Sequence, residues 1–250
     1  DLVRSRGLGD VYKRQIKNLQ FLNRPVQNGF EYTDWPVAVP SNNGTDINIQ
    51  LMHWEYIPDS IHDADELIAA RKKFTWLNAK GEHILINEKG NQSMYREGAM
   101  LGRVLVPSTG FFEWQHVAKT GRQGQALKTT EKIPHYITTD GPEEYFFMAG
   151  ISRVWHNLEM DQRAATFAVV TTEANELMQK IHNTKRRMPV ILPPDLALEW
   201  LQPNLSEERI QQLATYRYPA AKMKAWPVAK NFLQSSEPEK EVQPQQLSLL

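Results

Sequence analysis

Hydrophobic and polar residues alternate along much of the chain, as they do in strands that bury one face. The alternation is clearest over residues 47–58, "INIQLMHWEYIP". Other runs are rich in Val, Ile, Thr and aromatic residues and are bounded by Gly, Pro or Asp, which is typical of strands. These runs cover residues 82–87, 102–114, 134–140, 144–155 and 166–172.

A helical period is found in fewer segments. The segment 172–182 follows a threonine suited to cap a helix, and four of its apolar residues fall on one helix face: Ala174, Leu177, Met178 and Ile181. A second helix is predicted at 193–201, where prolines precede an apolar-periodic run. A third is predicted at 206–216, with Ser206 as the N-cap and two glutamates in the first turn.

The strands outnumber the helices and do not alternate regularly with them. This order favours an α+β fold built on a mostly antiparallel sheet over a doubly wound fold. The chain of 250 residues suits one large domain or two small ones. From Gln234 onward the sequence is polar and contains prolines, so we expect residues 234–250 to form a flexible tail.

Composition narrows the classes of function. Basic and acidic residues balance at 29 each, so any binding of nucleic acid must come from a local patch. The chain has no cysteine, which excludes disulfides, thiolate metal sites and a cysteine nucleophile within the sequence as given. No apolar stretch approaches the roughly 20 residues that span a bilayer, so we expect no membrane partner.

The run "VPSTGFFEWQ" holds the first candidate for chemistry. Glu113 lies between Phe112 and Trp114. A carboxylate among aromatic rings is desolvated, which raises its pKa and suits it to proton transfer. The stretch by itself favours the alternative interpretation, in which Glu113 points to solvent while the aromatic rings point inward.

The run "IHNTKRRMPVIL" holds the second candidate. His182 ends a predicted helix and is followed by Lys185, Arg186 and Arg187. The histidine could act as an acid or base beside an anionic substrate, with the cations as phosphate contacts. The stretch by itself favours the alternative, in which a histidine and basic residues at a helix C-terminus complement the helix dipole without any further role.

A third stretch, "ARKKFTWLNAKGEHIL", interleaves basic and aromatic residues. Arg71, Lys72, Lys73 and Lys80 could follow phosphates while Phe74 and Trp76 stack on bases, as in proteins that bind single-stranded nucleic acid. A solvated basic turn is the alternative. We expect no metal site, because the seven histidines are not spaced as metal ligands.

Five motifs, taken in order, resemble the SRAP family (SOS response-associated peptidase domain). They cover about residues 16–233 and read "LMHWEYIPDSI", "LNAKGE", "GRVLVPSTGFFEW", "FMAGISRVW" and "VVTTEANELMQKIHNTKRRMPVIL". The resemblance implies a barrel-like β core with a few flanking helices. It also implies a monomer that is cytoplasmic and associated with the bacterial nucleoid.

The resemblance implies a sensor of abasic sites in single-stranded DNA. Family members form a covalent crosslink to the ring-opened aldehyde through a cysteine that follows the initiator Met. An α-amine has a pKa near 7.7–8.0, so a useful fraction is neutral and can attack the aldehyde. The thiol of the same residue then closes a thiazolidine ring.

Site residues follow from the matching motifs. The resemblance gives Asn78, Glu113 and His182 catalytic roles: Asn78 orients the N-terminal residue, Glu113 assists proton transfer, and His182 acts on the sugar. It implies DNA contacts for Trp54, Lys80, Trp114 and Arg187. It implies no cofactor and no metal.

The sequence departs from the family pattern in several places. Lys80 replaces an arginine, which keeps the charge but loses the bidentate fork. Glu55 replaces a glycine, and Val104 replaces a cysteine. The first fifteen residues, "DLVRSRGLGDVYKRQ", match no part of the family. We expect residues 1–15 to be a non-native leader and 16–233 to be the SRAP domain without its N-terminal catalytic segment.

Other functions stay open at this stage. The family name implies a peptidase, which could remove the residues before the cysteine with help from Glu113 and His182. A catalytically silent module that binds single-stranded DNA is a further alternative. The sequence therefore leaves open whether the chain acts as an enzyme, either a hydrolase of peptide bonds or a lyase-like crosslinking protein.

Overall fold

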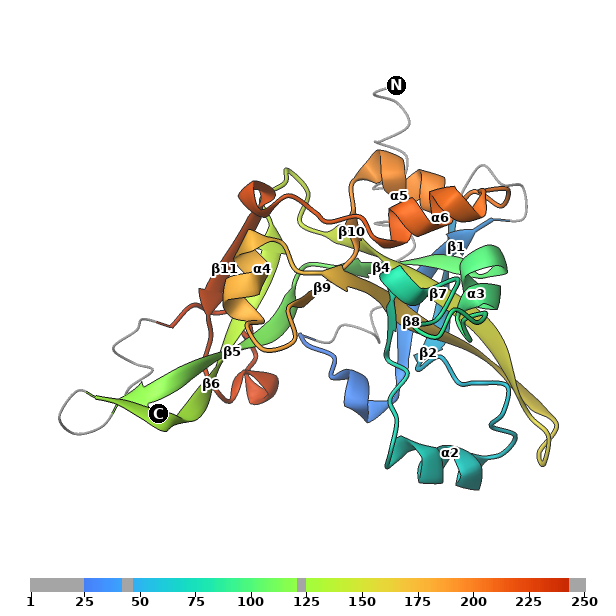
Figure 1. Ribbon diagram of the computed structural model, residues 1–250, viewed down its shortest axis with the longest axis horizontal. Coiled ribbons are helices and arrows are strands. Elements are labelled where there is room, and N and C mark those ends of the chain that lie inside the picture. The colour runs from blue at the N-terminus through green and yellow to red at the C-terminus, as the bar shows by residue number, and fades with distance from the viewer. Residues whose placement is uncertain (1–24, 42–46, 121–124, 243–250) are drawn as a thin grey trace.

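The protein combines two β-sheets with short helices around them (Figure 1). The structure is a computed structural model and describes residues 25–41, 47–120 and 125–242. Among the described residues, the larger sheet has eight strands and the smaller has three. Strands predominate and helices are few and short, so the α+β class expected from the sequence is confirmed.

Five strands of the larger sheet close into a barrel-like ring. They are β1 (Asp34–Pro40), β2 (Ile47–Trp54), β4 (Arg103–Ser108), β7 (Phe146–Asn157) and β8 (Gln162–Glu173). Their order is β7-β4-β1-β2-β8, and β7 also pairs with β8, which closes the ring. The pairing of β2 with β8 is parallel and the other pairings in the ring are antiparallel.

Three short strands extend this sheet. β3 (Asn78–Lys80) pairs in parallel with the last part of β8, and β9 (Arg187–Pro189) pairs with the same part in antiparallel. β10 (Ile191–Leu192) pairs with β7. The C-terminal end of β8 therefore lies between two strands that each carry a predicted site residue.

The smaller sheet is an antiparallel unit that projects to one side of the ring (Figure 1). It consists of β5 (Phe111–Thr120), β6 (Ala126–Thr139) and β11 (Met223–Pro227), in the order β11-β6-β5. β4 ends at Ser108 and β5 begins just after Gly110, so only a short link joins the two sheets.

Helices cover the sheets at several places. Near the ring lie α3 (Arg96–Leu101), α5 (Pro194–Trp200) and α6 (Glu207–Ala214), while α2 (Ala64–Arg71) lies at the opposite end of the view (Figure 1). α4 (Glu176–Ile181) packs against β5. Single turns of 3₁₀ helix are η2 (Gly29–Glu31), η3 (Gly81–His83), η4 (Ala220–Lys222) and η5 (Phe232–Gln234).

Strand β1 is buried on both faces. In β1, Val37 and Val39 pack in one apolar cluster, while Ala38 between them packs in the other. The first cluster includes Met178 and Ile181 of α4. The second includes Trp200 of α5 together with residues of α6. A strand that is buried on both faces has no alternation to detect, which explains why β1 was not predicted.

Most predicted elements are confirmed. Strands lie in five of the six predicted runs, and helices lie at 193–201 and 206–216, where Ser206 Oγ accepts a hydrogen bond from the Arg209 amide (3.1 Å). The predicted strand at 82–87 is wrong, because the segment forms η3 and a single bridge. Within this segment, the adjacent residues Ile84 and Leu85 are both buried. Adjacent side chains of a strand point to opposite faces, so a strand with one buried face would expose one of the two.

The helix expected over 172–182 begins later than predicted. Residues up to Glu173 belong to β8, and Asn175 is the N-cap, with its side chain accepting from the Met178 amide (3.0 Å). Three residues here are of a type that caps helices, namely Thr171, Thr172 and Asn175. Pairing of β8 with β9 as far as Glu173 decides which of them is used.

Part of the expected tail makes defined contacts. Trp226 Nε1 donates to the Glu239 carbonyl (2.6 Å), and Val228 and Glu241 form a β-bridge. Residues 243–250 and the expected leader 1–15 lie outside the described residues. Within the described ranges, no helix is long and apolar enough to cross a membrane.

Candidate functional site

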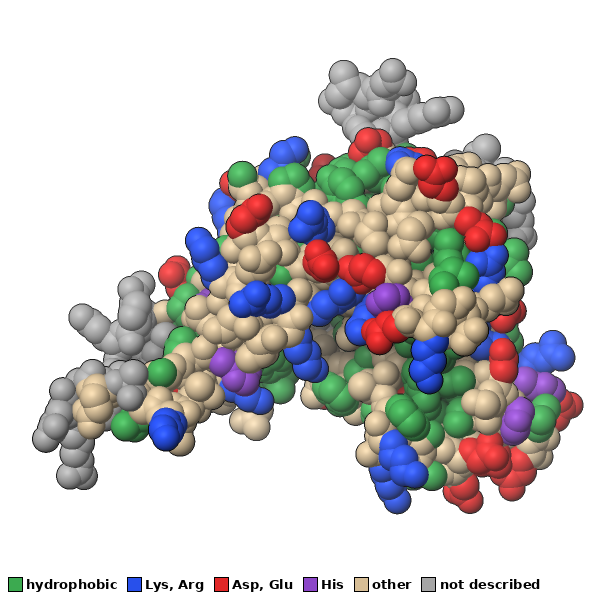
Figure 2. Space-filling view, in the orientation of Figure 1, with side chains coloured by type: hydrophobic (Ala, Val, Ile, Leu, Met, Phe, Trp, Pro, Cys, Tyr) green, Lys and Arg blue, Asp and Glu red, His purple; other side chains and the backbone are tan. Residues whose placement is uncertain are grey.

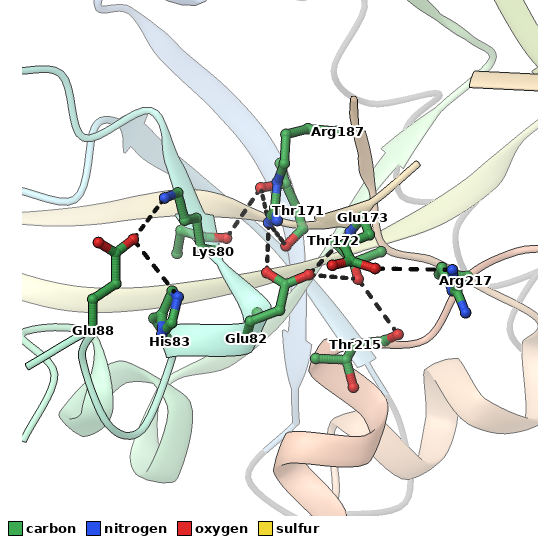
Figure 3. Close-up of polar contacts among 12 residues, drawn as sticks. Lys80, Glu82, His83, Glu88, Thr171, Thr172, Glu173, Arg187, Thr215 and Arg217 are labelled. Atoms are coloured by element: carbon green, nitrogen blue, oxygen red, sulfur yellow. Dashed lines mark hydrogen bonds and ion pairs between the residues drawn. The ribbon is translucent and has the colours of Figure 1, made fainter. Parts of the chain in front are cut away.

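The end of β8 brings together residues from distant parts of the chain. Its Thr171 is the register partner of Lys80 on β3, and its Glu173 is the register partner of Arg187 on β9. Glu82 lies in η3, directly after β3. Figure 3 shows these side chains gathered over one edge of the larger sheet.

Arg187 is held at this edge by three contacts. Its guanidinium lies 2.8 Å from Glu82 Oε2 and donates to the carbonyl (2.7 Å) and hydroxyl (3.1 Å) of Thr171. The second oxygen of Glu82 accepts from Thr172 Oγ1 and from the Glu173 amide, both at 3.0 Å. The guanidinium is thus fixed in direction as well as in place (Figure 3).

Glu82 is a site residue that the sequence analysis did not select. Burial acts to raise the pKa of its carboxyl, but hydrogen bonds and charge from Arg187 outweigh burial and hold the pKa below its usual value. Its place at the end of "LNAKGE" was the available signal. A Cβ on the preceding Gly81 would lie 1.8 Å from the Ala214 carbonyl oxygen, so α6 can approach only because residue 81 is glycine.

Glu113 and His182 meet where β5 faces α4. Glu113 Oε1 lies 3.5 Å from His182 Nδ1, and the same nitrogen lies 2.9 Å from the Arg187 carbonyl oxygen. A carbonyl oxygen can only accept, so Nδ1 carries the proton in that hydrogen bond. The neutral imidazole then has its lone pair on Nε2, which can accept a proton from a substrate.

Glu113 is half-buried against His182, on the opposite face of β5 from the Trp114 ring. Its side chain is 25% exposed, and burial raises the pKa of its carboxyl, although the charge of His182 and a hydrogen bond from the Trp114 amide act in the opposite direction. A carboxyl with a raised pKa keeps its proton at higher pH than a free glutamic acid does. Glu113 is therefore able to donate a proton.

Hydrogen bonds from the residues just after Glu113 secure the contact of β5 with α4 and the loop that follows it. Gln115 Nε2 donates to the Lys180 carbonyl (3.1 Å). The His116 amide donates to Asn183 Oδ1 (3.0 Å), and Asn183 Nδ2 donates back to the His116 carbonyl (2.8 Å). These bonds position the smaller sheet against the loop that carries His182.

A strained turn connects His182 to Arg187. The His182 amide still bonds to the Met178 carbonyl (2.8 Å) at the end of α4. Arg186 then has a left-handed backbone, with φ of 52°, while its amide donates to the His182 carbonyl (2.8 Å). Non-glycine residues adopt this conformation at a cost, and they do so where surrounding bonds enforce it.

The side chains of the other predicted residues make contacts of their own. Asn78 and Lys80 are exposed on β3, and Lys80 Nζ lies 2.8 Å from Glu88 Oε1. Trp54 Nε1 donates to the Leu77 carbonyl (3.0 Å), and its ring stacks on Phe167, so it packs beside the start of β3. Both tryptophan side chains predicted to contact DNA are at least partly accessible.

Trp114 lies on the opposite face of β5 from Glu113. Its ring packs near Phe232, at 5.9 Å between centroids, and is 38% exposed. Successive side chains of a strand point to opposite faces, so Trp114 and Glu113 cannot line the same wall. The structure joins Glu113, His182 and Arg187 by direct contacts, aligns Asn78 and Lys80 along β3, and separates Trp114 from them.

The surface is hollowed beside this centre (Figure 2). The hollow lies between α4 and the strands β8 and β2, and Lys and Arg side chains gather around it. An acid and a base in contact, with a fixed guanidinium beside them, suit proton transfer on an anionic substrate. Among the described residues, no group of three or more His, Asp or Glu side chains is placed to hold a metal ion.

Comparisons with known proteins agree on one family. The family described as SOS response associated peptidase (SRAP) matches residues 10–234. Abasic site processing protein YoaM of Bacillus subtilis is 31% identical over 189 residues, 75% of this chain and 71% of that protein. YoqW of the same species, also named an abasic site processing protein, is 29% identical over 188 residues, 75% of this chain and 72% of that protein. A solved protein of Bacteroides thetaiotaomicron, at 28% identity, has a TM-score of 0.76 and covers 95% of this chain and 96% of that chain.

Proposed function

Because the chain belongs to the SOS response associated peptidase family, we propose that it processes abasic sites in single-stranded DNA. The relatives named abasic site processing proteins support this role. The observation that carries the proposal is the contact between Glu113 and His182, a carboxyl with a raised pKa beside an imidazole with a free lone pair.

The proposed reaction is capture of the ring-opened sugar by an N-terminal cysteine. The neutral amine adds to the aldehyde, the resulting carbinolamine loses water to give an imine, and the thiol adds to the imine carbon. One thiazolidine and one water form from one aldehyde and one aminothiol. The sequence printed here contains no cysteine, so the reaction requires a chain that begins with one after removal of the initiator Met.

The site residues have distinct roles in this proposal. Glu113 donates the proton with which the carbinolamine hydroxyl leaves as water. His182, through Nε2, accepts a proton from the sugar hydroxyl as the ring opens. Asn78 orients the N-terminal residue.

Charged and aromatic residues account for DNA binding. Arg187, fixed by Glu82 and Thr171, presents its charge to a phosphate beside the lesion. Lys80 offers a second, less directional contact, because an ammonium lacks the planar fork of arginine. Trp54 is the proposed wall beside Asn78, and Trp114 contacts DNA that passes the outer face of β5.

Covalent capture is tested by supplying the nucleophile. We would express chains in which Met-Cys is joined at each residue from 16 to 20, with Met-Ser chains as matched controls. After incubation with single-stranded DNA carrying an abasic site, at least one Met-Cys chain is expected to give an adduct that survives denaturing electrophoresis. The Met-Ser chains and the printed chain are expected to bind without such an adduct.

Each other outcome contradicts a specific part of the proposal. No adduct from any Met-Cys chain would argue against covalent capture and for a silent DNA-binding module. An adduct from the Met-Ser or printed chain would show that another amine is the nucleophile. Cleavage of an unrelated peptide that is lost in Glu113→Ala and indifferent to DNA would support the peptidase alternative.

A further inference from the structure

The segment from Lys72 to Lys80, here the 72–80 segment, joins α2 to the candidate site. Leu77 and Ala79 are buried and hold the segment to the core. Phe74, Asn78 and Lys80 are exposed, and Trp76 is half-buried. The segment therefore presents accessible side chains along most of its length, and two of them, at its end, belong to proposed site residues.

The two aromatic rings of this series are arranged as a stacking surface. Phe74 and Trp76 lie with their ring centroids 6.0 Å apart and their planes 28° apart. Trp76 packs against the core cluster, and its carbonyl accepts from the Tyr56 amide (2.9 Å), so it is fixed in place. Phe74 is 60% exposed, which leaves one of its faces free to stack on a flat ligand.

Charge is separated along α2 in a way that favours an anion at this end. Asp65 and Glu66 lie in its first turn, while Lys72 and Lys73 follow its last turn. Figure 2 shows acidic side chains at the far end of α2 and basic ones at the end beside the hollow. Within the described part of the chain, neither lysine forms an ion pair, so both ammonium groups are available to an anion.

The segment continues into the site described above. It rises from α2 to β3 along the edge of the hollow, where hydrophobic side chains gather (Figures 1 and 2). Phe74 and Lys80 are six residues apart, which is at most about 20 Å of chain. A single strand of DNA that is bound at Asn78 and Lys80 can therefore extend along the protein surface as far as the two aromatic rings.

We propose that the 72–80 segment binds the unpaired DNA strand on one side of the abasic site. Phe74 and Trp76 stack on bases next to the lesion, and Lys72 and Lys73 contact the phosphates between them. Stacking tolerates any base, so this subsite adds affinity without sequence preference. The inference rests on the proposed function, because it assumes that the abasic nucleotide itself lies at Glu113 and His182.

The test uses the parent chain, to which no Met-Cys is joined, and three single-stranded oligonucleotides. One has nucleotides on both sides of an abasic site, one has them only on the 5′ side, and one only on the 3′ side. Phe74→Ala should weaken binding of the two-sided oligonucleotide and of one of the one-sided ones by roughly 5- to 150-fold. Binding of the other one-sided oligonucleotide should not change.

A second variant tests the phosphate contacts. The double variant Lys72→Glu, Lys73→Glu should bind DNA with a weaker dependence on salt. In a plot of the logarithm of the binding constant against the logarithm of the salt concentration, the slope should change by about 0.7 for each phosphate that the variant no longer neutralises. Leu158→Ala and Arg163→Glu are control variants outside the 72–80 segment, because Leu158 is exposed in the turn between β7 and β8 and Arg163 is exposed at the start of β8. Both should bind all three oligonucleotides like the parent.

The outcomes separate this inference from the proposed function. If the parent does not prefer abasic over intact DNA, the proposed function fails. If that preference holds but Phe74→Ala binds all three oligonucleotides like the parent, or weakens both one-sided ones equally, the inference about the 72–80 segment is wrong. An unchanged thermal midpoint for Phe74→Ala excludes unfolding as the cause of a weaker affinity.

Discussion

Glu113 and Glu55 are both withdrawn from solvent, but their surroundings shift the pKa in opposite directions. For Glu113, burial prevails and raises the pKa. Glu55 is fully buried, yet hydrogen bonds from His53 and Arg71 outweigh burial and lower its pKa. Arg71 Nε lies 3.0 Å from Glu55 Oε2. The first carboxyl suits proton transfer, and the second is a fixed structural charge.

Replacement of Glu55 is expected to destabilise the fold. Glu55→Gln leaves the Arg71 guanidinium beside a buried neutral group, and loss of one partner of such a pair costs about 3 kcal/mol of unfolding free energy. Because the folded-state pKa of Glu55 is lowered, its contribution is complete above the ordinary value of 4.5 and is lost as pH falls through the folded value. Urea unfolding at pH 7 and pH 3 measures both effects.

The control for this prediction is Glu159→Gln, at an exposed position in the turn after β7. It should change the unfolding free energy by less than about 0.5 kcal/mol. If Glu55→Gln were as stable as the parent at pH 7, or lost equal stability at both pH values, the buried ion pair would not have the structural role given to it.

At the residue scale, sequence motifs located the candidates, but burial decided their chemistry. "GFFEW" drew attention to Glu113 but did not fix its orientation, because strand alternation alone does not say which face of β5 meets α4. Glu82 was not selected, since its contacts with Thr172 and Arg187 join residues about 90 and 105 positions apart. Such pairings are set by the fold and are not visible in local spacing.

The element that controls the position of His182 is the turn between α4 and β9. Arg186 has φ of 52°, and its carbonyl accepts from the Ala174 amide (2.9 Å). The turn thus ties both ends of α4 to the residue that precedes Arg187. The orientation of the imidazole depends on a backbone conformation that most side chains disfavour.

Substitutions at Arg186 should separate backbone strain from charge. Arg186→Val places a β-branched residue at positive φ and is expected to lower stability by about 1–3 kcal/mol. Arg186→Gly removes the same charge but adopts the conformation freely, so it should stay close to the parent. Thermal unfolding compares the two variants. Equal destabilisation of both would mean that the side chain of Arg186, and not its backbone, holds the turn.

At the element scale, amphipathic segments were predictable and fully buried ones were not. The helices at 193–201 and 206–216 were predicted from their periodicity and end signals. β1 was missed because both of its faces are buried. The ends of α3 and α5 depend on Arg103, whose guanidinium donates to the carbonyls of Met100 (2.8 Å) and Trp200 (2.7 Å). No local pattern indicated this buried arginine.

At the scale of the whole molecule, the candidate site lies at the junction of the two sheets. Glu113 comes from the smaller sheet, His182 follows α4, and Arg187 lies at the edge of the larger sheet. The α+β class was predictable from the strand content. The docking of β5 on α4 was not, because it depends on bonds such as those between His116 and Asn183.

This arrangement makes the rate of adduct formation depend on Glu113. In the Met-Cys chain, the rate should rise as the N-terminal amine loses its proton near pH 7.7–8.0. It should fall as Glu113 loses its own proton, which happens at higher pH than for a free glutamic acid because burial raises the pKa. The Glu113→Gln variant cannot donate the proton, so its rate of adduct formation should not show this fall as the pH rises.

The most direct test is the rate of adduct formation by the Met-Cys chain and its Glu113→Gln variant, measured from pH 5 to pH 9 on single-stranded abasic DNA. We predict that the variant is slower by roughly 10²- to 10⁴-fold while it binds the DNA with the affinity of the parent. A variant that forms the adduct at the parent rate across this pH range would contradict the assignment of Glu113 and His182 as the acid–base pair.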